Sequence, residues 1–207
     1  QIIIGRVEDG TGAMLIGSST FRDNVAFHAG SITVESNTLV GQLLSSQESI
    51  EITARSGGII TNDDIFATDA ELRSRDSITV NNLLEVADFI ILDAGTDGTG
   101  SITINGATIT TAASGTVELT SGAAGGDIVI TGSISTFGAN LTAASGAITQ
   151  TAGNTKASDL LALAENGVTL LTTADHISAR VTGSGDIQIA DTNVDPAHFV
   201  DLGSKTG

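Results

Sequence analysis

The chain lacks several residue types on which other kinds of protein depend. It contains no cysteine, which excludes disulfides and thiolate metal sites. It has no tryptophan or tyrosine and only 6 phenylalanines, so a core must be built from isoleucine, leucine, valine and alanine. Proline occurs once, at Pro196, so nearly every backbone N–H is available for hydrogen bonding. This composition favours a thin, regular core of stacked layers over a bulky globule.

Positive charge and long apolar runs are also scarce. The 8 basic residues face 24 acidic ones, which gives a net charge of −16. Such a charge disfavours binding to nucleic-acid phosphates and to anionic membranes, and it suits a soluble surface. No run of about 18 apolar residues is present, so no transmembrane helix is predicted. The start, QIIIGRVEDG, lacks the features of a signal peptide, so the chain is expected to be either cytoplasmic or a piece processed from a longer protein. The abrupt ends favour the second.

What the chain has in abundance is a short beat of the form aliphatic–any–aliphatic, led by a small or acidic residue. It occurs at 31–34, 49–52, 77–80, 101–104, 127–130, 167–170 and 186–189. The beats recur at intervals of roughly 18–28 residues, about 22 on average, if the longest gap is counted as two intervals. Further alternations pair Leu84 with Val86, Ile90 with Leu92, Val117 with Leu119, and Leu161 with Leu163. Alternation of this kind indicates short strands with one buried face.

These repeats predict an all-β fold, a single-stranded parallel β-helix (solenoid) of about nine coils. Coils of this kind stack so that their aliphatic side chains form continuous interior rows. The alternative is an antiparallel β-sandwich, in which Asn105-Gly106 and Asp97-Gly98 would be hairpin turns. The solenoid is favoured because the beat recurs once per coil length and large aromatic residues are few.

One elongated domain is expected over residues 1–207. Residues 30–190 carry the clear repeats, and residues 1–30 are less regular, as in an interface or cap coil. Residues 191–207 are interpreted as a tail. The stretch 154–167 is rich in helix formers, but a solenoid would make it a strand through Leu161 and Leu163.

The repeat pattern and composition of residues 30–190 resemble those of the repeat shafts of filamentous-haemagglutinin-type bacterial surface adhesins. The stretches that carry the resemblance are DAGTDGTGSITING, GTVELTSGAAGGDIVITG and ANLTAASGAITQTAG. The resemblance implies a right-handed β-helix exported to the cell surface, where it serves as a stalk or a binding surface. The family's secretion domain carries Asn-Pro motifs, whereas the only proline here follows Asp195. The resemblance therefore implies a shaft segment or a self-assembling relative.

Some acidic and histidine residues are candidates for a calcium-binding or a hydrolytic site. Asp93 and Asp97 in one turn, and 62–64 in another, have the oxygen ligands that calcium prefers, but the glycine–aspartate repeat of calcium-binding rolls is absent. His28, His176 and His198 are isolated in the sequence and are interpreted as surface residues. A hydrolytic site would need His198 beside Asp191 or Asp195 and a serine, without any nucleophile-elbow or zinc spacing to support it. We therefore predict no metal, cofactor or catalytic residue.

Two further surface features were considered. A carbohydrate-active β-helix needs converging carboxylates, at least three, or basic residues for an acidic sugar, of which Arg73 and Arg75 are the best pair. The acidic residues are predicted to be spread among the turns instead. Outward threonines, predicted at 103, 108, 110 and 120, would bind ice only with a fixed coil length, so they are interpreted as ordinary strand residues.

The sequence thus predicts a structural or adhesive β-helical segment of a secreted bacterial surface protein, extracellular or on the cell surface, without catalysis. One alternative is the subunit of a self-assembling extracellular filament. Another is a β-helical carbohydrate-active enzyme. The expected partners are other copies or flanking coils at the open ends of the β-helix, and surface molecules of host or neighbouring cells. No nucleic-acid partner is expected.

Overall fold

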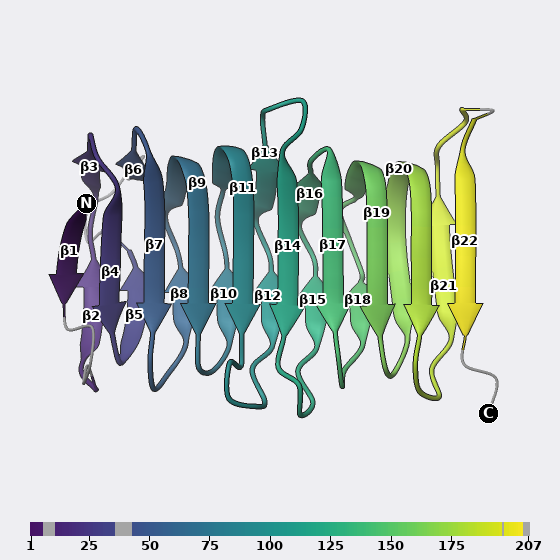
Figure 1. Cartoon of the computed structure of the whole chain (residues 1–207), viewed down its shortest axis with the longest axis horizontal. Helices are drawn as coiled ribbons and strands as arrows, with labels where there is room; N and C mark the ends of the chain where they lie inside the picture. The colour runs from purple at the N-terminus through teal and green to yellow at the C-terminus, as the bar shows by residue number, and fades with distance from the viewer. Residues whose placement is uncertain (6–10, 36–42, 196, 205–207) are drawn as a thin grey trace.

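The protein is a rod made of parallel β-strands, seen side by side in Figure 1 with the two termini at opposite ends. The computed structural model describes residues 1–5, 11–35, 43–195 and 197–204. Its 22 strands form one continuous parallel sheet that coils into about nine turns. The predicted parallel β-helix is confirmed, and the antiparallel sandwich is excluded because the strand pairs are parallel.

No helix that could cross a membrane is found in the described part of the chain.

Each coil places one strand on each of three faces. The first face holds β1 (Ile2–Gly5), β4 (Val25–Ala29), β7 (Ser49–Ala54), β14 (Thr116–Ser121), β17 (Gly138–Ala143) and β22 (Phe199–Ser204). The second holds β2 (Ala13–Ile16), β5 (Ser31–Val34), β8 (Ile59–Thr61), β10 (Ile78–Val80), β12 (Ile102–Ile104), β15 (Ile128–Ile130), β18 (Ile148–Gln150) and β21 (Ile187–Asp191). The third holds β3 (Ser19–Phe21), β6 (Leu43–Ser46), β13 (Ala107–Thr110) and β16 (Ser133–Ser135).

Four longer strands bend around a corner and so belong to more than one face. They are β9 (Asp64–Ser74), β11 (Leu84–Ala94), β19 (Thr155–Ala164) and β20 (Val168–Val181). The third face turns into the first face at each of these bends. Among the described register partners, coil length varies from 17 residues between Asp159 and His176 to 27 between Ile32 and Ile59. Loops at the corners absorb this difference, so the strands of every coil stay in register.

The second face supplies the most regular row of the core. Register partners stack one inward residue of each strand directly over the next: Ile32, Ile59, Ile78, Ile102, Ile128, Ile148, Val168 and Ile187. All but Ile187 are buried. The long gap in the sequence pattern holds the Ile148 strand, whose second inward residue is Gln150 in place of an aliphatic. The beat at Ile50 and Ile52 lies on the first face instead, which explains the irregular spacing around it.

The third face carries threonines in its inward row, which the sequence analysis did not anticipate. Thr108, Thr155 and Thr172 are buried in register with Leu84 and Ile134. The prediction that Thr108 and Thr110 point outward was therefore wrong, because both are buried. The residues at 103 and 120 are half-buried on outward positions, as predicted.

The stretch 154–167 forms a strand, β19, and not a helix. Its register differs from the one predicted. The buried residues are Leu160, Ala162 and Ala164, whereas Leu161 is 44% exposed. The pair Leu161 and Leu163 alternates as well as the pair Leu160 and Ala162, so the local sequence pattern could not decide which pair is buried. The neighbouring coil decides, because Ala139 and Leu141 stack on Leu160 and Ala162.

The ends of the chain join the same stack. Strand β1 pairs with β4 and strand β2 with β5, so the described part of residues 1–30 is built into coils. At the other end, β22 lies within the stretch interpreted as a tail and pairs with β20. The inward positions of both terminal strands remain partly uncovered, since Ile2 is 40% and Leu202 is 51% exposed.

Glycines occupy the corner between the second and third faces, where the backbones of successive coils leave no room for a side chain. Gly106, Gly132 and Gly153 lie at this corner in neighbouring coils. A Cβ atom on Gly132 would overlap the carbonyl oxygen of Gly106, and one on Gly153 would overlap that of Gly132. Asn105-Gly106 is thus a corner between β12 and β13, not the hairpin turn of a sandwich.

Asparagine side chains join the coils at the same corner by a ladder of hydrogen bonds. Asn62 Nδ2 donates to Glu35 Oε2 at 3.1 Å, Asn81 Nδ2 to Asn62 Oδ1 at 2.7 Å, and Asn105 Nδ2 to Asn81 Oδ1 at 2.8 Å. Thr131 Oγ1 then donates to Asn105 Oδ1 at 2.7 Å. Each asparagine side chain of the ladder therefore donates a hydrogen bond to the preceding coil and accepts one from the following coil. These bonds join successive coils along the corner.

Candidate functional site

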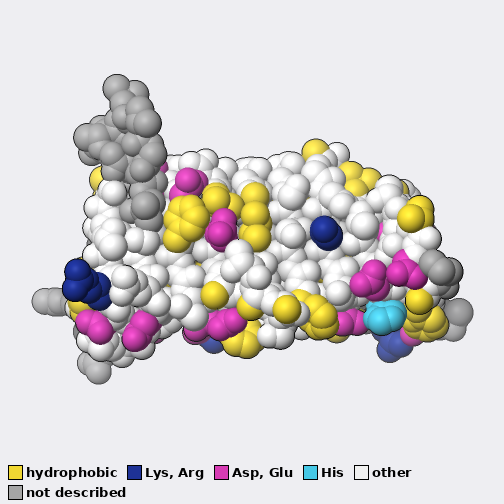
Figure 2. Space-filling view, turned by 90° about the horizontal axis from the view of Figure 1, so that it is seen from above, with side chains coloured by type: hydrophobic (Ala, Val, Ile, Leu, Met, Phe, Trp, Pro, Cys, Tyr) yellow, Lys and Arg dark blue, Asp and Glu magenta, His cyan; other side chains and the backbone are white. Residues whose placement is uncertain are grey.

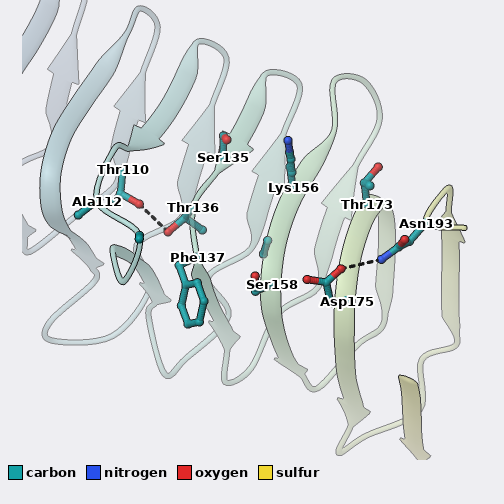
Figure 3. Close-up of a pocket in the computed structure, with 12 residues that line it drawn as sticks. Thr110, Ala112, Ser135, Thr136, Phe137, Lys156, Ser158, Thr173, Asp175 and Asn193 are labelled. Carbon is teal, nitrogen blue, oxygen red and sulfur yellow. Dashed lines mark hydrogen bonds between the residues drawn. The ribbon is translucent and has the colours of Figure 1, made fainter. Parts of the chain in front are cut away.

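A groove of about 330 Å³ runs along the corner where the third face turns into the first. Figure 3 shows its side chains coming from successive coils, from Thr110 near one end to Asn193 at the other. The volume lies at the lower end of the range for small-molecule sites, about 300–1,000 Å³. The groove is therefore large enough to hold a short stretch of an elongated ligand.

Two rows of side chains line the groove because the coils are in register. Ser135 pairs with Lys156, and Lys156 pairs with Thr173, so these residues form one row along the rod. The second row contains Phe137, Ser158 and Asp175: the N–H of Ser158 donates to the Phe137 carbonyl at 2.8 Å, and Ser158 lies beside Asp175 in the β19–β20 register. The residues of each row are thus one coil apart.

Hydrogen bonds hold the polar wall of the groove in place. Asn193 Nδ2 donates to Asp175 Oδ1 at 3.0 Å and to the carbonyl of Ala174 at 2.7 Å. Thr173 Oγ1 accepts from Asn154 Nδ2 at 2.9 Å and lies 2.7 Å from Thr192 Oγ1. The wall is consequently ordered before any ligand arrives, which reduces the entropic cost of binding.

The aromatic ring and the cation of the groove are exposed to solvent. Phe137 is 45% exposed, in a protein that has no tryptophan or tyrosine. Lys156 is exposed, and no ion pair within the described ranges involves it. Asp175 is the only carboxylate among the lining residues. A typical glycosidase uses two carboxyl groups on opposite sides of the scissile bond, and the lining residues of this groove include one.

A second hollow, of about 320 Å³, lies on the first face and is acidic. Glu51, Asp69 and Glu71 line it together with Phe89 and Ile91. Glu51 and Glu71 are register partners, so they lie one above the other. Figure 2 looks onto the adjoining corner and shows hydrophobic and acidic side chains gathered over the N-terminal half. The prediction that acidic residues are spread among the turns was therefore wrong for this part of the first face.

The arginines considered as a sugar-binding pair are occupied by carboxylates of this face and its edge. Arg73 Nη1 lies 3.1 Å from Asp93 Oδ2, and Arg73 Nε donates to Glu71. The hydrogen bond with Glu71 raises the pKa of Arg73, helped by the nearby carboxylates and opposed by partial burial. Arg75 pairs with Asp97 in the same way. Both arginines are therefore partnered, and neither is free for an acidic sugar.

Three of the four carboxylates in the two turns predicted as candidate calcium sites are held in other contacts, whereas Asp63 Oδ2 is buried and has no hydrogen-bond partner among the described residues. Asp93 and Asp97 are the arginine partners just described. Asn62 belongs to the asparagine ladder, and Asp64 Oδ1 accepts the N–H of Leu83 at 3.2 Å. Within the described ranges, no group of three or more histidine and carboxylate residues could hold a metal ion.

The structure brings two of the histidines beside aspartates. His176 Nδ1 lies 3.0 Å from Asp159 Oδ1 on the outside of the first face. His198 Nε2 lies 2.9 Å from Asp191 Oδ2, in an orientation that does not meet hydrogen-bond geometry. That pair links the end of β21 to the start of β22.

The remaining candidates, His28 and Asp195, do not form a histidine–aspartate pair in the described part of the chain. Asp195 accepts the backbone N–H of His198 through its carbonyl at 3.0 Å. His28 is buried, which corrects its assignment to the surface. These contacts have a structural explanation, and none of them forms part of the groove.

Among the residues that line the groove, only Thr110 is singled out by the sequence, as an outward strand residue. Phe137 and Lys156 belong to neither a recurring motif nor a charged cluster, and they become neighbours only through the register of the coils. The one sequence feature that could have pointed to the groove is Phe137, a large apolar residue between two predicted strands.

Comparison of the chain with protein-family models, with curated proteins and with solved structures finds no match.

Proposed function

We propose that this chain is a structural and adhesive segment of a secreted bacterial surface protein, which presents a binding surface without catalysis. The observation that carries the proposal is the corner groove, in which Phe137 and Lys156 are exposed on an otherwise regular stack of coils. Its rigid backbone suits a role as a shaft, and its groove suits the capture of another surface molecule.

The absence of catalysis is proposed from the placement of the carboxylates. The groove has Asp175 alone. The acidic hollow has the three carboxylates that an enzyme would need, but Glu71 is paired with Arg73 and Glu51 accepts from Thr53 Oγ1 at 3.3 Å. Glu71, held in a salt bridge, is a poor proton donor, so an enzymatic role for the hollow would depend on Asp69.

The adhesive role is tested with beads coated with the purified chain. We expect the beads to adhere to bacterial or host cell surfaces, while the chain releases no product from a panel of polysaccharides. The control is a bead coated with the chain unfolded by heat. Adhesion no stronger than that of the control would contradict the proposal. So would product release that is abolished by Asp69→Asn, because it would place an enzyme in the acidic hollow.

A self-assembling filament is the second candidate, supported by the exposed inward rows at both ends. Val200 and Leu202 continue the rows of Ile177 and Ala179, and they are 41% and 51% exposed. They also line a hollow of about 610 Å³ beside β21. A second copy or flanking coils would cover it.

Electron microscopy over a hundredfold range of concentration separates these cases. Fibres that lengthen with concentration would establish the filament. Separate short rods at every concentration would exclude it and leave the shaft.

A further inference from the structure

We propose that the corner groove binds a linear, uncharged polysaccharide whose chain runs along the axis of the rod. The inference rests on the proposed function as a binding surface, and it adds the chemical class of the ligand. Three properties of the groove lead to it, namely the spacing of its rows, the mixture of its side chains and its charge.

The spacing of the rows matches a polymer. Ser135, Lys156 and Thr173 stand on successive coils in strict register. Neighbouring strands of a sheet are about 4.8 Å apart, which is close to the advance of one pyranose ring along an extended sugar chain. Each ring of such a chain would therefore meet an equivalent polar side chain. A compact ligand would use only one of these positions.

The side chains of the groove suit a sugar ring, which has apolar C–H faces and a polar rim. Phe137 offers an exposed aromatic face at the corner, against which C–H groups can pack. Hydroxyls of Ser135, Ser158 and Thr173 line the same groove. Those of Ser135 and Ser158 can both donate and accept a hydrogen bond, whereas Thr173 Oγ1 already bonds Asn154 and Thr192. Figure 3 shows Ser135 and Thr173 in one row with Lys156, and Ser158 in the other row between Phe137 and Asp175.

The polar pair at the far end of the groove adds directed hydrogen bonds. Asp175 is oriented by the 3.0 Å bond from Asn193 and keeps its other oxygen for a ligand hydroxyl. Lys156 supplies donors with no acceptor, so it pairs with ring or hydroxyl oxygens. Donors and acceptors are thus both present, as the hydroxyl groups of a sugar require.

Charge selects an uncharged sugar. Lys156 and Asp175 contribute one charge of each sign to the groove, whereas the chain as a whole carries −16. An acidic polysaccharide would be repelled by that overall charge. A cationic one would be drawn to Glu51, Asp69 and Glu71 in the acidic hollow instead. A neutral chain avoids both effects, and its binding should depend little on salt.

A tryptophan at position 137 reports on binding directly, because the chain has no tryptophan of its own. The Phe137→Trp variant is titrated with soluble fragments of cellulose, chitin, mannan and galactan, and with polygalacturonate as the acidic comparison. We expect at least one neutral fragment to change the tryptophan emission. Phe89→Trp is the matched control, since Phe89 is 50% exposed but lies in the acidic hollow. Its emission should not respond.

Calorimetry then tests which residues bind. We expect Phe137→Ala to weaken binding of that fragment by about tenfold through loss of the aromatic contact, with Lys156→Gln also weaker and Phe89→Ala unchanged. Circular dichroism and urea midpoints confirm that each variant is folded.

The inference fails if no neutral fragment binds, if polygalacturonate binds best with strong salt dependence, or if Phe89→Ala weakens binding as much as Phe137→Ala. Beads whose adhesion to cells is undiminished by Phe137→Ala would overturn the inference alone. Beads of unchanged protein that never adhere would instead overturn the proposed function on which it rests.

Discussion

Replacing Ile104 by alanine is expected to lower the free energy of unfolding by about 2–5 kcal/mol, and replacing it by aspartate to lower it further. Ile104 ends β12, is fully buried, and stacks between Val80 and Ile130 in the second-face core. Alanine would leave a cavity that neighbouring coils cannot close, since their strands are fixed by the ladder on both sides. Aspartate would add an unpaired buried charge, which costs several kcal/mol unless it is protonated.

The measurement is urea unfolding followed by far-ultraviolet circular dichroism. Thr103→Ala in the middle of the same strand is the control, because Thr103 is half-buried and faces outward. We expect it to change stability by less than about 1 kcal/mol. An equally small effect of Ile104→Ala would remove Ile104 from the core row. The total stability of a domain is about 5–15 kcal/mol, so Ile104→Asp is expected to leave little folded protein.

Gly132→Ala should destabilise the protein by about 3 kcal/mol, which is unusual for the addition of one methyl group. The new Cβ would occupy the position of the Gly106 carbonyl oxygen in the coil below. That carbonyl cannot move aside freely, because Gly132 and Ser133 donate their N–H groups to the carbonyls of Ile104 and Gly106 at this corner. Either the coils separate locally or these hydrogen bonds break.

Gly17→Ala is the matched control, because a Cβ at Gly17 would have no atom within 4 Å. Alanine at such an open position typically leaves stability unchanged or raises it slightly. Thermal unfolding of both variants, followed side by side, decides the matter. If Gly132→Ala melted at the same temperature as Gly17→Ala, the close stacking of coils at this corner would be refuted.

The fold could be predicted from the sequence because a repeated local pattern specifies it. The isoleucine of each second-face strand lies at the same place in its beat, so Ile78, Ile102 and Ile128 could be aligned without a structure. Glycine-rich stretches between the beats marked the corners. The number of coils followed from the average spacing, since coils of unequal length compensate one another.

Details that depend on contacts between coils could not be predicted. Leu161 and Leu163 alternate as well as Leu160 and Ala162 do, and only stacking on Leu141 and its neighbours buries the second pair. Thr108 looked like an outward residue because its hydroxyl is polar, yet it fills the inward row between Leu84 and Ile134. Residue type alone is a weak guide where a neighbouring coil determines burial.

The groove was hidden for the same reason. Phe137, Lys156 and Asp175 come from different coils, and nothing in their local sequence separates them from ordinary turn and strand residues. Their neighbourhood arises from the lengths of the intervening coils.

The unequal coil lengths and parallel ladders also have a mechanical consequence. Hydrogen bonds between coils run along the rod, so a force that pulls its ends apart acts on every interface between coils. The coil from Arg73 to Asp93 takes 20 residues. In the rod it advances the chain by about 4.8 Å, whereas drawn out fully it would span roughly 70 Å. Each coil that yields would thus lengthen the molecule more than tenfold at that point, and the rod would act as a tether that gives way in steps before it breaks.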